Sequence, residues 1–104
     1  MSEIFYDCPA KAMITLFKGK FSLDILTQIF NGTTHYNQLL RTIPEINSRI
    51  LAKRLRDFEE IGILKRTILV AEPPMSIRYD LTEKGRALNE VVQSLGDWMQ
   101  TNEG

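Results

Sequence analysis

The chain has 104 residues, 43% of them hydrophobic and 25% charged, which is the composition of one globular domain rather than of a disordered or two-domain chain. Its single cysteine excludes an intrachain disulfide framework and favours a reducing cytoplasm, and no apolar run is long enough to span a membrane. The 13 cations and 13 anions cancel, but residues 41–78 hold 8 cations and 5 anions, whereas residues 79–104 hold 2 and 5. A chain without net charge can therefore present a basic face to a polyanion.

Two helices are predicted in the first third of the chain. Pro9 suits the first position of a helix, with Asp7 or Cys8 before it as the cap. Ser22 can cap the second helix, and the pair Asn31–Gly32 is a typical C-terminal stop.

Two further helices follow, separated by a short link, and the second is basic. A cap within Thr33–Thr34 begins the first, and Pro44 prevents its continuation because proline lacks an amide hydrogen. A cap within Asn47–Ser48 begins the second, which runs to Ile61 and stops at Gly62. Two helices joined by so short a link are the outline of a helix-turn-helix.

After the basic helix the apolar period changes from about 3.6 to about 2, which predicts strands. Residues 63–70 are rich in β-branched side chains, residues 71–74 form a tip containing two prolines, and residues 75–81 alternate as a half-buried strand. Thr82 then caps a last helix. A helix-turn-helix followed by this hairpin predicts a winged helix-turn-helix, an α+β and mostly α fold, in a single domain over residues 1–104.

The basic helix carries most of its charge away from the core. Steps of about 100° per residue put Leu51, Leu55 and Phe58 on one side and most of the cations on the opposite side. In a helix-turn-helix the N-terminal half of the second helix enters the major groove, where arginine and lysine donate to guanine. The predicted DNA contacts of this helix are Asn47, Ser48, Arg49, Lys53 and Arg56.

The same charges have a simpler interpretation. Lys53 lies one turn from Asp57, so the two can pair on an exposed helix without binding anything, and Arg56 and Glu60 have the same spacing. Arg54 instead falls within the apolar arc, so we expect its stem on the core and its charged head at the domain edge.

Three cations lie on the predicted hairpin. Lys65 and Arg66 are at its base and Arg78 is on the return strand, where a wing meets the phosphate backbone or the minor groove. Lysine and arginine on strand edges also deter aggregation, so each of the three has a structural alternative.

The residue inventory excludes the common catalytic sites. His35 is the only histidine, so neither a catalytic triad nor a histidine metal cage can form within one chain. The glycines do not cluster as a phosphate loop. We therefore expect no enzyme, no metal and no cofactor. The remaining alternative to DNA binding is a winged helix used for protein assembly or small-molecule sensing.

Three segments carry the most specific motifs: CPAKAMITLFKGKFSLDIL, FNGTTHYNQLLRTIPEINSRILAKRLRDFEEIGILKRT and EPPMSIRYDLTEKGRAL. They contain a Cys-Pro start, an Ile-Pro-x-Ile-x-x-Arg link and a Pro-Pro tip followed by Tyr-x-Leu-Thr-x-x-Gly. Over about residues 8–100 the chain resembles the HxlR-type winged helix-turn-helix transcriptional regulators. The resemblance implies a prokaryotic homodimer that binds double-stranded DNA at inverted half-sites, and it leaves the effector open.

The resemblance also implies that the first and last helices form the dimer interface. The last helix agrees with this, because its apolar face ends in Trp98 and Met99 and exceeds what one small domain needs to cover. The interface residues implied on this helix are Leu88, Val92, Leu95, Trp98 and Met99.

Two positions depart from the family pattern. Phe21 stands where the family usually has tryptophan, a change of volume that the core can absorb. His35 stands where the family often has arginine on the first motif helix, so the resemblance makes His35 a weakened contact to a DNA phosphate.

Cys8 matches a cysteine that some members of this family use to sense oxidants or electrophiles. The helix dipole acidifies a thiol at a helix start, whereas the neighbouring Asp7 opposes this effect. With no second cysteine, oxidation gives a Cys8–Cys8 bond across the dimer, a mixed disulfide or an adduct. The alternative is an inert thiol.

Overall fold

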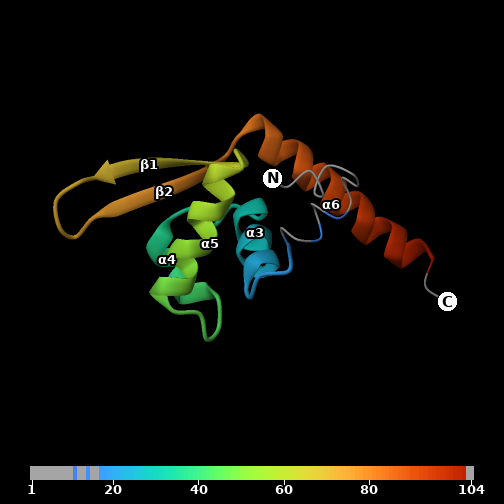
Figure 1. Cartoon of the computed structure of the whole chain (residues 1–104), viewed down its shortest axis with the longest axis horizontal. Coiled ribbons are helices and arrows are strands. Elements are labelled where there is room, and N and C mark those ends of the chain that lie inside the picture. Colours follow the sequence, from blue (N-terminus) through green and yellow to red (C-terminus); the bar gives the residue numbers. More distant parts are fainter. Residues whose placement is uncertain (1–10, 12–13, 15–16, 103–104) are drawn as a thin grey trace.

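The computed structural model describes residues 11, 14 and 17–102. The predicted first helix lies for the most part outside these residues, as do Asp7, Cys8 and Pro9. The secondary structure that the model describes consists of α3 (Ser22–Phe30), α4 (Tyr36–Thr42), α5 (Ser48–Glu60), β1 (Leu64–Val70), β2 (Ser76–Leu81) and α6 (Glu83–Thr101), shown in Figure 1.

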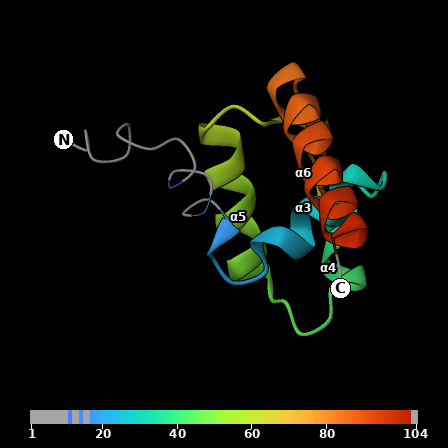
Figure 2. The same cartoon turned by 90° about the vertical axis from the view of Figure 1, so that its right-hand side faces the viewer.

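The helices α3, α4 and α5 form a body beside the antiparallel hairpin of β1 and β2. The hairpin and α6 leave this body in opposite directions (Figure 1), and α3 lies between α5 and α6 in both views (Figure 2). The predicted winged helix-turn-helix is confirmed. None of the helices among the described residues combines the length and the apolar character needed to cross a membrane.

The core is formed by apolar side chains of the helices and of the base of the hairpin. Leu51, Leu55 and Phe58 on α5 are no more than 1% exposed, as the apolar arc of that helix predicts. Full burial of a side chain of this size stabilises the fold by about 1.5–3 kcal/mol. The other core residues are Ile25, Leu26, Ile29, Leu39, Ile43, Ile63, Leu64, Tyr79 and Leu88.

The start of α3 differs from the prediction. Its N-cap is Phe21, in the left-handed region at φ 65°, and Ser22 is the first helical residue and only 2% exposed. The Ser22 amide donates to the Gly19 carbonyl oxygen at 3.1 Å, so a tight turn replaces a side-chain cap. The Phe21 ring packs against the core, which offsets the strain of its backbone. The predicted cap at Ser22 is therefore wrong, because tertiary packing sets the turn.

The start of α4 differs in the same way. The N-cap is His35 rather than a residue of Thr33–Thr34, and its side chain makes no capping bond. The Thr34 carbonyl oxygen accepts from the Tyr79 amide at 2.8 Å, and His35 forms an isolated antiparallel bridge with Arg78. The segment before α4 is thus held extended against β2, so the helix begins one residue later than a threonine cap would allow.

The predicted N-cap of α5 and its stop before Gly62 are confirmed, although the helix ends one residue before the predicted Ile61. The Asn47 Oδ1 accepts from the Ile50 amide at 2.9 Å and caps the helix. The helix ends at Glu60, and Gly62 follows at φ 87°, a left-handed conformation that favours glycine. The basic helix therefore has fixed ends, which fix the direction of its side chains.

The hairpin pairs β1 with β2 in a register that places Leu64 opposite Leu81 and Arg66 opposite Tyr79. The pairing shifts by one residue between Ile68 and Val70. The strands are one residue shorter at their starts than the predicted ranges 63–70 and 75–81.

Thr82 caps α6 as predicted and ties this helix to the end of α5. Its Oγ1 accepts from the Gly85 amide at 3.0 Å and donates to the Gly62 carbonyl oxygen at 2.6 Å. A Cβ atom on Gly85 would overlap the Ile63 carbonyl oxygen, so only glycine allows this close approach. The direction of α6 is therefore fixed by contacts between its first turn and the backbone of Gly62 and Ile63.

Candidate nucleic-acid interface

The outward face of α5 carries three exposed cations, Arg49, Lys53 and Arg56. Arg49 follows directly after the first helical residue, whereas the Lys53 Nζ lies 3.1 Å from the Asp57 carboxylate. Among the described residues Arg49 forms no hydrogen bond or ion pair. Arg49 is therefore available to an external partner, and Lys53 is held by a pair of the predicted kind.

Arg54 lies at the edge of the core, as expected. Its side chain is 21% exposed, its Nε donates to the Lys20 carbonyl oxygen at 2.9 Å, and a guanidinium nitrogen lies 3.8 Å from Asp57. This arginine ties α5 to the turn before α3. Its role is structural rather than that of a free cation.

A cleft of about 380 Å³ separates α5 from the hairpin. It brings Arg56 of α5 and Arg66 of β1, both predicted DNA contacts, to the same cleft. We name it the helix–wing cleft, and its lining residues are Tyr36, Ala52, Arg56, Glu59, Arg66, Ile77 and Tyr79.

The two tyrosines of the helix–wing cleft were missed by the sequence analysis as site residues. Burial raises the pKa of the Tyr79 hydroxyl, and the nearby Arg66 guanidinium partly offsets this rise. Burial also raises the pKa of Tyr36, whose hydroxyl donates to the Ser48 carbonyl oxygen at 3.3 Å. Both phenols therefore stay protonated near neutral pH and can donate hydrogen bonds. The alternation of residues 75–81 marked Tyr79 as half-buried but gave no sign of the cleft.

The hairpin register separates the three wing cations. Partners opposite each other in a sheet share a face, so Arg66 lies on the face of Tyr79, towards α5. Lys65 and Arg78 lie on the other face with Asp80, whose carboxylate accepts from the Arg78 Nε at 2.7 Å. The structure therefore does not bring the predicted wing contacts together on one surface.

The tip of the wing carries apolar rather than basic side chains. Residues 67–77 include no lysine or arginine, and Glu72 is their one charged residue. Ile68, Leu69, Val70 and Met75 are exposed there. Cationic contacts by the wing are thus confined to its base.

The last helix presents an exposed apolar surface beyond the domain. Leu88 is 9% exposed and belongs to the core of this chain, and Val92 packs against that core. Other apolar residues of this helix, from Val91 onward, are exposed, and we name the surface that they form the α6 apolar face. Its members are Val91, Leu95, Trp98 and Met99, of which Trp98 is 60% exposed.

Two further predictions concern reactive groups. Cys8 lies outside the described residues, so its predicted sensing role stays a prediction. Within the part of the chain that the structure describes, no three histidine, cysteine or carboxylate side chains cluster as a metal site would require.

A helix-turn-helix with a basic second helix and a paired-strand wing defines a DNA-binding transcriptional regulator of the winged helix-turn-helix class. The chain belongs to the HxlR-like helix-turn-helix family, whose sequence profile matches residues 16–104. The predicted family is confirmed.

Named relatives are HTH-type transcriptional regulators, and solved structures share the fold. The uncharacterized HTH-type transcriptional regulator YdeP of Bacillus subtilis is 31% identical over 97 residues, which cover 93% of this chain and 75% of YdeP. The transcriptional regulator YodB of the same organism is 33% identical over 92 residues, covering 88% of this chain and 81% of YodB. The reduced form of YodB superposes with a TM-score of 0.74 over 92% of this chain and 94% of that chain. The redox regulator HypR in its oxidized form superposes with a TM-score of 0.70 at 28% identity, over 93% of this chain and 99% of that chain.

Proposed function

We propose that the chain acts as a homodimeric, sequence-specific transcriptional regulator whose α5 reads an inverted-repeat operator in the major groove. The observation that carries this proposal is the outward, unpaired Arg49 in the first turn of a capped basic helix. A guanidinium in this position can donate to both acceptors of guanine. Asn47 and Ser48 lie beside it as short polar groups for bases or phosphates.

The cations of α5 and the wing are expected to divide their roles. Arg49 is free to read a base, whereas Lys53 must leave Asp57 or bind a phosphate while still paired. Arg56 and Arg66 reach the helix–wing cleft from two elements. Two guanidinium groups in this arrangement suit a backbone phosphate of a DNA strand that passes between α5 and the wing. Lys65 and Arg78 lie on the far face of the hairpin and should contribute less.

The test compares binding to the operator with binding to scrambled DNA. The operator is first selected from a pool of random duplexes, and each variant is then titrated by fluorescence anisotropy at several salt concentrations. Arg49→Ala should weaken operator binding by about 1–3 kcal/mol. The difference in binding free energy between operator and scrambled DNA should therefore become smaller. Arg66→Ala should weaken both duplexes alike and lower the salt slope by about 0.9 for each phosphate that the variant no longer neutralises.

Arg86→Ala is a matched control, because Arg86 lies on α6 and its guanidinium donates to the Leu81 carbonyl oxygen. Arg86→Ala should leave the ratio of operator affinity to scrambled-DNA affinity unchanged. If Arg49→Ala and Lys53→Ala both retain full discrimination, α5 does not read bases and its charge is only a solvated face.

We assign dimerisation to the α6 apolar face, with a second copy of the chain as its partner. Contiguous exposed apolar surface of this kind marks an interaction site, and it continues the apolar side of α6 beyond the core residue Leu88. Leu95→Asp should convert a dimer into a folded monomer in light scattering at micromolar concentration. Gln93 lies on the opposite side of the helix, so the control Gln93→Asp should leave the dimer intact. A wild-type monomer in this range would contradict the assignment.

We propose in addition that oxidants change DNA affinity through Cys8. The similarity to YodB and HypR, described in reduced and oxidised or diamide-treated forms, supports this. In the step proposed, two Cys8 thiols of a dimer lose their hydrogens and form one disulfide, and the N=N bond of diamide accepts both hydrogens. Diamide should change operator affinity in the wild type but not in Cys8→Ser. The same response in both proteins would exclude this cysteine.

A further inference from the structure

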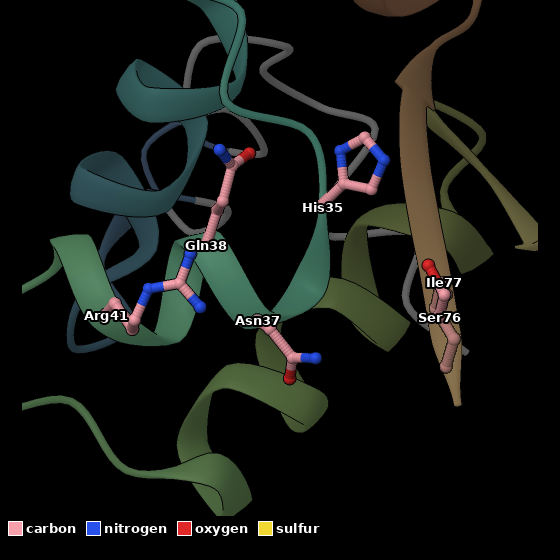
Figure 3. Close-up of a pocket in the computed structure, with 6 residues that line it drawn as sticks. All are labelled: His35, Asn37, Gln38, Arg41, Ser76 and Ile77. Carbon is pink, nitrogen blue, oxygen red and sulfur yellow. The ribbon is translucent and has the colours of Figure 1, made fainter. Parts of the chain in front are cut away.

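A second hollow, open to the surface and of about 320 Å³, lies on the wing side of the helix-turn-helix, between α4 and β2 (Figure 3). Figure 3 shows side chains from both elements around this space. We name it the α4–wing hollow. Its lining residues are His35, Asn37, Gln38, Arg41, Ser76 and Ile77.

The lining of the α4–wing hollow is rich in hydrogen-bond donors and contains no carboxylate. Arg41 supplies a permanent positive charge, and His35 adds an imidazole that can donate as well as accept. Asn37, Gln38 and Ser76 supply amide and hydroxyl donors. Among the described residues, none of these five side chains forms a hydrogen bond or an ion pair with another protein group.

The fold does not need these side chains where they are. The opposite side of α4 provides the core residue Leu39, and the C-cap residue Ile43 also lies in the core. His35 caps α4 through its backbone, without a capping bond from its ring. Arg41 is exposed and lies one turn after Asn37. The donors are thus free to bind a group from outside.

A donor-rich hollow with one guanidinium and no competing carboxylate matches an oxyanion. A phosphate offers several acceptor oxygens, and the planar guanidinium can hold two of them. We propose that the α4–wing hollow binds a phosphate group, with Arg41 as its charged anchor and His35, Asn37, Gln38 and Ser76 as neighbouring donors. The group comes either from the DNA backbone, which the first helix of such a motif crosses, or from a free phosphate compound. The DNA source rests on the proposed function, whereas binding of free phosphate does not.

The only histidine of the chain provides a direct probe of this site. The ring signals of His35 are followed by nuclear magnetic resonance while sodium phosphate replaces sodium chloride at constant pH and ionic strength. We expect a saturable shift in the wild type, and about tenfold weaker phosphate binding in Arg41→Gln, since a charge-assisted bond is removed. Arg86→Gln is the matched control, because Arg86 is also an exposed arginine but lies on α6, outside the hollow, and the response of this variant should equal that of the wild type.

A second arm separates the two sources. If the site holds a DNA phosphate, a saturating duplex abolishes the response of His35 to phosphate, and Arg41→Gln lowers the salt slope of DNA binding by about 0.9. If the site serves a free phosphate compound, the response persists on DNA. Should Arg41→Gln fail to fold in a thermal melt, Ser76→Asp replaces it, since it puts an anion into the same hollow. No saturable shift with phosphate, together with an unchanged salt slope in Arg41→Gln, overturns the proposal.

If the chain proves not to discriminate operator from scrambled DNA, the phosphate titration still decides whether the α4–wing hollow binds phosphate. Failure of the proposed function and failure of this site are therefore distinguishable.

Discussion

Removing the Thr82 hydroxyl should weaken the junction between the wing and α6. This hydroxyl accepts from the Gly85 amide at 3.0 Å and donates to the Gly62 carbonyl oxygen at 2.6 Å. Loss of an N-cap costs about 1 kcal/mol, and loss of a second, partly buried hydrogen bond costs about 0.5–1.5 kcal/mol. Thr82→Ala should therefore lower the free energy of unfolding by about 2 kcal/mol.

Two further substitutions at Thr82 isolate the hydroxyl. Thr82→Val keeps the volume without the hydroxyl and should be as unstable as Thr82→Ala, whereas Thr82→Ser keeps both hydrogen bonds and should stay within about 0.5 kcal/mol of the wild type. Urea unfolding followed by circular dichroism measures these differences. All proteins are compared at one concentration, because dimerisation adds to apparent stability. Thr82→Ser as unstable as Thr82→Ala, or Thr82→Ala within about 0.5 kcal/mol of the wild type, would refute the reasoning.

Three other substitutions test separate contacts. Arg54→Met keeps the apolar stem but loses the hydrogen bond to a backbone carbonyl, so it should cost about 1–2 kcal/mol in urea unfolding and leave operator discrimination unchanged. Gly85→Ala forces a Cβ atom onto the Ile63 carbonyl oxygen and should cost about 3 kcal/mol. Gly96→Ala on the same helix is the control and should not destabilise the domain, because a Cβ atom there meets nothing within 4 Å. Equal thermal midpoints for the two variants would contradict this. Burial raises the pKa of Tyr79 above its ordinary value of 10.0, so the folded state holds the phenol proton more tightly than the unfolded state does. The contribution of this group to the free energy of unfolding is therefore fully present below pH 10 and is lost as the pH rises further. Urea unfolding from pH 8 to about 11 should show a smaller alkaline loss in Tyr79→Phe than in the wild type.

Local signals in the sequence predicted those elements whose ends depend on local chemistry. Asn47 caps α5 and Thr82 caps α6 because a side-chain oxygen next to free amides needs no distant partner. The caps predicted at Ser22 and Thr33–Thr34 were wrong because distant contacts decide there. A turn closed at Gly19 precedes α3, and pairing with β2 holds the segment before α4 extended.

The sequence predicted which residues of the candidate site are exposed on α5. It did not predict how residues of different elements are arranged on one surface. Helical periodicity placed Arg49 outside and Arg54 at the core edge, which the structure confirms. The hairpin register, which depends on how the two strands pair, put Arg66 and Arg78 on opposite faces. The tyrosines of the helix–wing cleft and the α4–wing hollow arise where separate elements meet. Such places have no signature in a single stretch of sequence.

The contacts at the first turn of α6 have a consequence for the spacing of an operator. With 19 residues, this helix is about 28 Å long, so a tilt of about 10° at its base moves its far end by about 5 Å. Base pairs follow one another at about 3.4 Å along DNA, so this small tilt exceeds one base-pair step. In a dimer joined through the α6 apolar face, the contacts of Thr82 and Gly85 with the backbone of Gly62 and Ile63 would therefore set the distance between the two reading helices. Such a protein would reject operators whose half-sites are one base pair too near or too far, although it touches none of the bases in between.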